Sequence, residues 1–308
     1  TIMVLVLVIV PIVVISEIGG VGETVSLINQ KGDKYLDLFK GTTTISILSL
    51  LAWGLGYCGQ PHILVRFMAI DKPSDLAKAR NIGITWMIFT VGGALLVGLV
   101  GIAYMLKFDQ TTMNIFDSSK TESETIFIYF SRILFHPLIG GFLLSAILAA
   151  EMSTISSQLL VTSSSLTEDI YKAFIKKDAS PKQLLTASRL SVLIVAVIAV
   201  LLSLTPKDSI LNLVGNAWAG FGAAFGPLIV FSLFWKKTTW QGALSGMLVG
   251  GAVVLAWVYI AHPYKDWYEM IPGFFSSAIV IYVVSLITQK PNKEIDKEFD
   301  EVVSILKK

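Results

Sequence analysis

The sequence contains little of the chemistry on which most enzymes and metal sites depend. Its 308 residues include one cysteine, Cys58, and three histidines. A single cysteine excludes a disulfide bond within the chain and any cluster of cysteine ligands, and the histidines do not have the spacing of metal ligands. The motifs of zinc peptidases, serine hydrolases, P-loop NTPases and dinucleotide-binding folds are missing as well. The sequence therefore predicts that the protein is not an enzyme.

Charged residues are also scarce. They make up 15% of the chain, with 24 basic residues against 22 acidic ones, whereas hydrophobic residues make up 54%. A nearly balanced charge argues against a nucleic-acid partner. So apolar a chain is typical of the lipid bilayer, and it predicts an all-α protein that crosses the cell membrane many times.

Apolar runs long enough to cross about 30 Å of hydrocarbon predict about eight membrane helices. These lie at 1–18, 42–70, 81–105, in the hydroxyl-rich stretch 145–171, and at 184–204, 210–235, 240–261 and 271–289. Short amphipathic helices are expected at 35–39 and 126–135. Residues 1–289 are thus predicted to form the transmembrane core, and 290–308 a charged tail that forms a helix.

The distribution of basic residues predicts the orientation of these helices. Lysine and arginine gather in the loops after the second, fourth and sixth predicted helices and in the tail. Because short loops rich in lysine and arginine stay in the cytoplasm, we expect these loops and the C-terminus to be cytoplasmic.

The stretch 145–171 begins as an apolar helix and then fills with hydroxyl groups. Successive residues of an α-helix are about 100° apart, so some small residues of this stretch fall within one narrow band of the helix surface, with Thr154 at its edge. These small residues are Ala146, Ala150, Ser153, Ser157 and Ser164. Neutral oxygens without sulfur or imidazole suit a hard cation such as sodium. Alternatively, the hydroxyls bond to carbonyls of their own helix or join neighbouring helices.

The second predicted helix is interrupted by GLGYCGQP at 54–61, where three glycines and a proline weaken an α-helix. A broken membrane helix is tolerated where it lines a cavity or is buried in protein, and transporters bind substrate at such breaks. Trp53, Tyr57 and Pro61 share one face at α-helical spacing. This face suits a small zwitterion with an apolar ring, or it is ordinary aromatic packing beside a kink. For Trp218 and Phe221, farther along the chain, packing is favoured over substrate contact.

Three segments resemble a known family in order and spacing. They are LAWGLGYCGQPHILVRFMA at 51–69, AAEMSTISSQLLVTSSSLTEDIYKAF at 149–174 and NAWAGFGAAFGPLIVFSLFW at 216–235. All three resemble the sodium/solute symporter family, specifically its sodium/proline symporter branch, and the resemblance covers essentially the whole chain. It implies part of a LeuT-like inverted-repeat transporter that carries a small solute, L-proline, together with sodium by alternating access.

The resemblance also implies roles for individual residues. It assigns sodium binding to the hydroxyls of Ser153 and Thr154 and the carbonyl of Ala150. Residues matching Trp53, Tyr57 and Pro61 are implicated in proline binding and in the coupled movement of family members.

Two further residues of the hydroxyl-rich helix are candidates for a supporting role at the sodium site, Ser157 and Glu151. The resemblance implies an apolar residue at the position where this chain has Glu151. On a helix Glu151 lies about 160° from Ser153 but about 60° from Thr154. It either has a supporting or proton-linked role through Thr154, or it is a protonated residue hydrogen-bonded to a neighbouring helix, or a sequence change introduced deliberately.

Relative to the family, the chain is expected to be the later part of a longer transporter that lacks the first several helices. Its expected partners are sodium, proline and the lipid bilayer. Pantothenate and sugar transporters share the fold, but the run WGLGYxGQPH favours proline. The alternative function is that of a transporter-like membrane module that senses a solute without transporting it.

Overall fold

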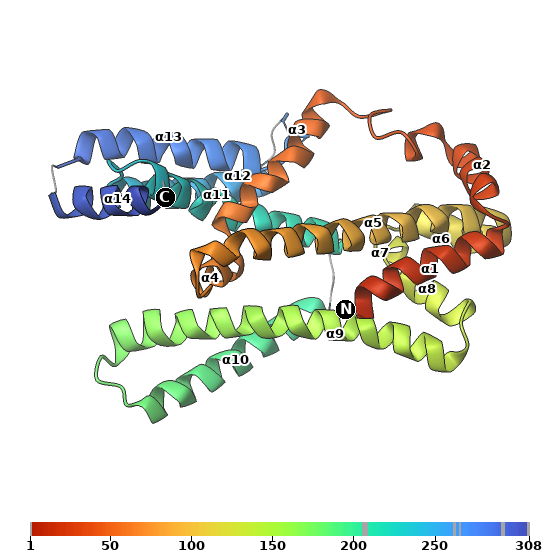
Figure 1. Cartoon of the computed structure of the whole chain (residues 1–308), viewed down its shortest axis with the longest axis horizontal. Helices are drawn as coiled ribbons and strands as arrows, with labels where there is room; N and C mark the ends of the chain where they lie inside the picture. Colours follow the sequence, from red (N-terminus) through yellow and green to blue (C-terminus); the bar gives the residue numbers. More distant parts are fainter. Residues whose placement is uncertain (1, 205–208, 261–262, 265, 291–292, 307–308) are drawn as a thin grey trace. The chain divides into compact units, whose positions relative to one another are not determined.

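The structure is a computed structural model that describes residues 2–204, 209–260, 263–264, 266–290 and 293–306, and all regular elements within them are helices. The chain divides into two compact units. Unit 1 comprises Thr1–Gly41 and Ala69–Ser209, and unit 2 comprises Thr42–Met68 and Ile210–Lys308. Figure 1 gives the order of the helices along the chain.

Unit 1 begins with two helices joined by a sharp turn. Helix α1 (Ile2–Ile18) and α2 (Val21–Lys31) are bent by 86°. The turn consists of Gly19 and Gly20, whose φ angles of 110° and 105° are in the left-handed region that favours glycine.

The amphipathic helix predicted at 35–39 is wrong. The helix of this loop is α2, and only the 3₁₀ turn η1 (Asp33–Tyr35) follows it. Gly32, with a φ of 153°, ends α2 before the predicted position.

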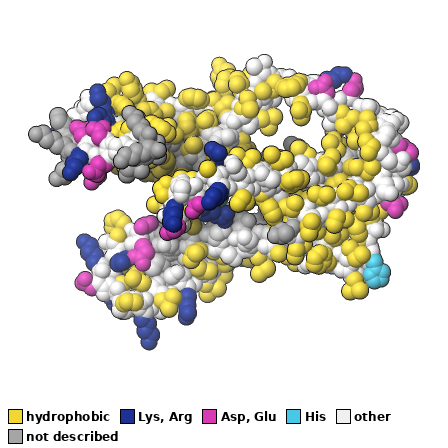
Figure 2. All heavy atoms as spheres, viewed as in Figure 1, with side chains coloured by type: hydrophobic (Ala, Val, Ile, Leu, Met, Phe, Trp, Pro, Cys, Tyr) yellow, Lys and Arg dark blue, Asp and Glu magenta, His cyan; other side chains and the backbone are white. Residues whose placement is uncertain are grey.

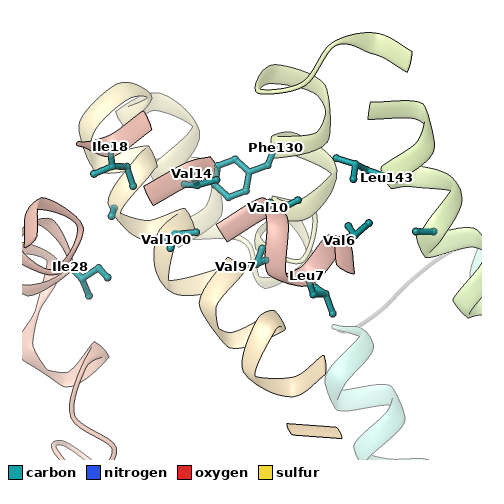
Figure 3. Close-up of a cluster of buried hydrophobic side chains, with 12 residues drawn as sticks. Val6, Leu7, Val10, Val14, Ile18, Ile28, Val97, Val100, Phe130 and Leu143 are labelled. Atoms are coloured by element: carbon teal, nitrogen blue, oxygen red, sulfur yellow. The ribbon is translucent and has the colours of Figure 1, made fainter. Parts of the chain in front are cut away.

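The core of unit 1 forms around α1 (Figure 3). Helix α5 (Leu76–Phe108, after the 3₁₀ turn η3 at Pro73–Asp75), α8 (Ile126–Ile133) and α9 (Pro137–Ser164) surround it. Buried apolar side chains of these helices meet those of α1 in one cluster: Val6, Val10, Val14, Ile18, Val97, Val100, Phe130 and Leu143. The amphipathic helix predicted at 126–135 is confirmed as α8, which buries Phe130 completely.

Polar contacts attach the short helices α2 and α6 (Gln110–Ser118) to one end of this core. The ammonium group of Lys107 donates to the carbonyl oxygen of Ile18 at 2.6 Å and to the Glu23 carboxylate at 2.5 Å. Asp109, which precedes α6 and α7 (Lys120–Ser123), accepts hydrogen bonds from Thr112 and from the Tyr129 hydroxyl of α8. These hydrogen bonds hold the pKa of the Asp109 carboxyl below its usual value, and those from Thr112 contribute most.

Helix α9 continues into the π-helix η4 (Ser165–Ile175), and α10 (Pro181–Ser203) returns beside it (Figure 1). Nothing in the sequence pattern predicts the π-helical turns. The Ser163 hydroxyl lies 3.4 Å from that of Ser188 on α10. Thr167, one turn farther along, is buried, and its hydroxyl has no hydrogen-bond partner among the described residues.

Unit 2 contains the broken helix and the four last helices of the chain. Helix α3 (Thr44–Ala52), the 3₁₀ helix η2 (Trp53–Gly59) and α4 (Pro61–Met68) form one interrupted span. The others are α11 (Ile210–Phe234), α12 (Trp240–Tyr259), α13 (Met270–Thr288) and α14 (Lys293–Leu306). The described part of the tail from Lys293 is thus helical, as predicted, and Asp300 of α14 lies 3.6 Å from the ammonium group of Lys236.

Six helices of the described residues are long and apolar enough to cross a membrane, or seven if α1 and α2 count as one span. The predicted count of eight is therefore not confirmed. The difference arises at the first two predicted spans, because α1 has 17 residues and the second span is broken at η2. Hydrophobic side chains cover much of the face drawn in Figure 2, as expected of helices that face lipid. The division into a transmembrane core at 1–289 and a tail outside the membrane at 290–308 stays a prediction.

The packing around Phe130 yields a first prediction. Phe130→Ala removes a ring that α1, α5 and α8 enclose completely, and we expect it to lower the free energy of unfolding by about 3 kcal/mol. Phe142→Ala is the matched control, because Phe142 lies on α9 with 54% of its surface exposed. Thermal unfolding of the purified full-length protein in detergent checks this, and equal midpoints for both variants would contradict the packing described.

Candidate functional site

The predicted interruption of the second membrane helix is confirmed. Helix α3 ends at Ala52, η2 follows, and α4 begins at Pro61. A 3₁₀ helix has three residues per turn, so the side chains of Trp53 and Tyr57 point about 120° apart around the helix axis. On an α-helix the same spacing separates them by about 40°. The four-residue spacing therefore does not by itself place these two rings on one face.

Trp218 of α11 brings the two rings together. The Trp53 ring stacks on the Trp218 ring at a centroid distance of 5.7 Å and on the Tyr268 ring at 5.8 Å. The Tyr57 ring meets Trp218 edge-on at 4.8 Å. Trp53 is thus largely engaged in aromatic packing, whereas Tyr57 keeps 43% of its surface exposed. Of the predicted substrate residues, Tyr57 has the most ring surface free for a ligand.

The 3₁₀ helix η2, where the α-helix is interrupted, is called the unwound segment below. Its backbone lies close to the backbone of α11. A Cβ atom at Gly59 would come within 2.6 Å of the Phe221 carbonyl oxygen and 2.8 Å of the Gly222 Cα atom. A Cβ atom at Gly56 would lie 2.0 Å from the Trp218 ring nitrogen. Gly56 and Gly59, two of the three glycines that interrupt the helix, are therefore also the residues that allow this approach.

Hydrogen bonds connect the same elements. The indole N–H of Trp218 donates to the Trp53 carbonyl oxygen at 3.0 Å, and the Gln60 side-chain amide donates to the Trp218 carbonyl oxygen at 3.1 Å. Gln60 is buried. The Tyr268 hydroxyl donates to the Gly215 carbonyl oxygen of α11 at 2.8 Å. Gln60 and Tyr268 are residues that the sequence interpretation missed, and Trp218 has the packing role that it favoured.

The start of α13 adds a carboxyl group to this neighbourhood. Burial, followed by the negative charge of Glu269, raises the pKa of the Tyr268 hydroxyl, and burial raises the pKa of the Glu269 carboxyl. One Glu269 oxygen is buried and has no hydrogen-bond partner among the described residues. The phenol therefore stays protonated at neutral pH and keeps its hydrogen bond to α11.

The predicted sodium residues lie within one turn of α9 in unit 1. The Thr154 hydroxyl donates to the Ala150 carbonyl oxygen at 3.3 Å, and the Ser157 hydroxyl donates to the Ser153 carbonyl oxygen at 2.8 Å. Ala150, Ser153 and Thr154 are exposed, although Ala146, one turn earlier, is buried in the unit 1 core. This is the back-bonded arrangement that the alternative interpretation predicts, and it still presents neutral oxygens on one open stretch of helix.

Glu151 lies on this exposed stretch as well, and its side chain forms no hydrogen bond or ion pair with another described residue. Two hydroxyls and one carbonyl do not complete the shell of a cation, which generally needs further oxygen ligands. The described part of α9 therefore offers a partial set of ligands of the right chemistry for sodium, and the role of Glu151 stays a prediction.

The fold is shared with a known transporter structure, the substrate-bound outward-open state of a Na⁺-coupled sialic acid symporter. The two align with a TM-score of 0.70 and 17% sequence identity over 95% of this chain and 61% of that one. The all-α, LeuT-like architecture predicted from the sequence is thus confirmed. The chain belongs to the sodium:solute symporter family, whose family model matches residues 1–250. Because this is a family of symporters, the expectation that the chain is not an enzyme is confirmed as well.

Several curated relatives are similar over almost the entire chain. The osmoregulated proline transporter OpuE of Bacillus subtilis is 54% identical over 98% of this chain. Sodium/proline symporter 2 of Staphylococcus saprophyticus is 50% identical over 99%, and the high-affinity proline transporter PutP of Bacillus subtilis is 50% identical over 96%. The chain spans 60% of the length of each of these relatives.

The close approach of η2 to α11 yields a second prediction. Gly59→Ala places a methyl group against backbone atoms of α11, which cannot yield as a flexible side chain does, and we expect a loss of about 1–3 kcal/mol in stability. Gly54→Ala in the same 3₁₀ helix is the control, because a Cβ atom there meets nothing within 4 Å. Unfolding midpoints of the two full-length variants measure the difference. If Gly59→Ala is as stable as Gly54→Ala, η2 does not lie this close to α11.

Proposed function

We propose that this chain forms the later helices of a symporter that carries L-proline into the cell together with sodium. The observation that carries the proposal is the unwound, aromatic segment η2, held at backbone distance from α11 in a family of sodium-coupled symporters. Similarity over nearly the whole chain to proteins named as proline transporters supports the choice of substrate.

The proposed substrate residues are Trp53, Tyr57 and Pro61. Tyr57 presents an exposed ring edge-on to Trp218, and aromatic faces suit both the apolar ring of proline and its positively charged nitrogen. Pro61 starts α4 and fixes the end of the unwound segment. Trp53 acts mainly by shaping this surface, since its ring lies between two other aromatic rings.

The proposed sodium ligands are the Ser153 and Thr154 hydroxyls and the Ala150 carbonyl, with Ser157 and Glu151 in supporting positions. To bind the ion, Thr154 gives up its hydrogen bond to the Ala150 carbonyl, so that both oxygens become ligands. We infer that the remaining ligands come from the earlier helices that the resemblance to the family implies, since the chain matches 60% of the length of the relative OpuE.

Sodium binding and proline binding then favour the same outward-open state, and release to the cytoplasm follows as the protein changes to the inward-open state. We place the protein in the cell membrane, with the basic loops and α14 on the cytoplasmic side, because lysine-rich and arginine-rich loops stay there.

Uptake of labelled proline by cells that produce the full-length protein tests the proposal. With a sodium gradient we expect saturable uptake, and with potassium in its place only the background of cells lacking the gene. A solute sensor would bind proline without accumulating it. Binding of proline to the purified protein without uptake would therefore replace the symporter by the sensor.

A third prediction concerns the sodium ligands. Ser153→Ala and Thr154→Ala each remove one neutral ligand from a small shell, and we expect the sodium concentration for half-maximal uptake to rise by about five-fold or more. Ser145→Ala is the matched control, because the Ser145 hydroxyl donates to the Phe142 carbonyl oxygen of the same helix at 2.7 Å. An unchanged sodium dependence in both test variants would remove this stretch of α9 from the sodium site.

A further inference from the structure

Trp218 is the one described residue that hydrogen-bonds to both ends of the unwound segment. Its indole N–H donates to the carbonyl oxygen of Trp53, the first residue of η2. Its own carbonyl oxygen accepts from the side chain of Gln60, the residue directly after η2. One residue of α11 thus spans the complete seven-residue break.

The surroundings of Trp218 are adapted to this arrangement. Gly56, in the middle of η2, leaves room for the indole, since a Cβ atom there would lie 2.0 Å from the ring nitrogen and 2.4 Å from Cδ1. Gln60 is 3% exposed, so its amide donates to Trp218 in a place shielded from solvent. Where an α-helix gives way to a 3₁₀ helix, backbone groups lose their regular partners, and hydrogen bonds from another helix stabilise the break.

The same indole also sets the orientation of Tyr57. The Tyr57 ring meets Trp218 edge-on at 4.8 Å, with an angle of 81° between the ring planes, and 43% of its surface is exposed. Fixing the two ends of η2 fixes the backbone from which Tyr57 projects, and the ring contact restricts its side chain.

We propose that Trp218 and Gln60 are positioning residues for substrate binding, which hold the unwound segment on α11 so that Tyr57 is presented to proline. This inference rests on the proposed function, in which Tyr57 contacts the substrate. Trp218 affects proline binding by holding the unwound segment and Tyr57 in place. Its indole N–H already donates to the Trp53 carbonyl oxygen.

The test compares three variants of the full-length protein that each lose one partly buried hydrogen bond. Trp218→Phe removes the indole donor but keeps an aromatic ring, and Gln60→Met removes the amide donor but keeps the length of the side chain. Trp257→Phe is the matched control. Its indole N–H donates to the Trp267 carbonyl oxygen at 3.1 Å in the same unit, so it loses the same kind of bond to an acceptor that does not belong to η2.

We expect Trp218→Phe and Gln60→Met each to raise the Kd for proline about five-fold, as the loss of one hydrogen bond permits, while Trp257→Phe leaves it unchanged. A second measurement, in a background where any other cysteine is replaced by serine, is the rate at which a maleimide alkylates Cys58 within η2. This rate should rise in the two test variants and not in the control. Gln60→Met keeps the test decisive if Trp218→Phe does not fold.

Tyr57→Ala separates the two possible failures. If Tyr57→Ala leaves the Kd for proline unchanged, the proposed substrate site is wrong. If Tyr57→Ala raises the Kd while Trp218→Phe and Gln60→Met match Trp257→Phe in both Kd and Cys58 alkylation, the substrate site stands and the positioning role of Trp218 and Gln60 is overturned.

Discussion

The contact that the rest of the site depends on is the approach of η2 to α11 at backbone distance. A break in a membrane helix exposes backbone groups that lipid cannot satisfy, so the break must lie against protein or water. Here glycines on both sides allow the contact, since a Cβ atom at Gly222 would lie 2.7 Å from the Gly56 Cα atom and 2.4 Å from the Met270 side chain. Trp218 then supplies the hydrogen bonds, and its ring organises the aromatic residues. Packing therefore accounts for Gly56 and Gly59 within 54–61, and the proposed substrate site would use the same segment.

The two units divide the proposed tasks. The residues proposed to bind substrate belong to unit 2, whose helices pack through glycines and aromatic rings. The residues proposed to bind sodium belong to α9 of unit 1, whose first half packs into the apolar core around α1. Farther along α9, the hydroxyls of Thr154 and Ser157 donate to carbonyl oxygens of their own helix. Weak, exchangeable hydrogen bonds of this kind suit a site that must bind an ion and later release it.

The sequence predicted the elements of the fold well because apolar runs in membrane proteins are long and hydrocarbon thickness limits their length. It also located the break at 54–61, since glycine and proline act locally. The geometry inside the break was not predictable from spacing: the 3₁₀ helix turns Tyr57 away from Trp53, and only Trp218, 165 residues beyond Trp53 in the chain, reunites them. The contacts of Gln60 and Tyr268 with α11 were not predictable, because a single buried amide or phenol has no periodic pattern, although Gln60 lies in the run that resembles the family. The π-helix η4 was missed for the same reason, as its composition suits an α-helix equally well.

The central claim is that sodium and proline bind to one protein with coupled free energies. The most direct test is the Kd for labelled proline, measured on the purified full-length protein over a range of sodium concentrations at constant ionic strength. Coupling requires the Kd to fall as sodium rises, and proline must strengthen sodium binding by the same factor. A proline Kd that stays constant from zero to saturating sodium would contradict the account.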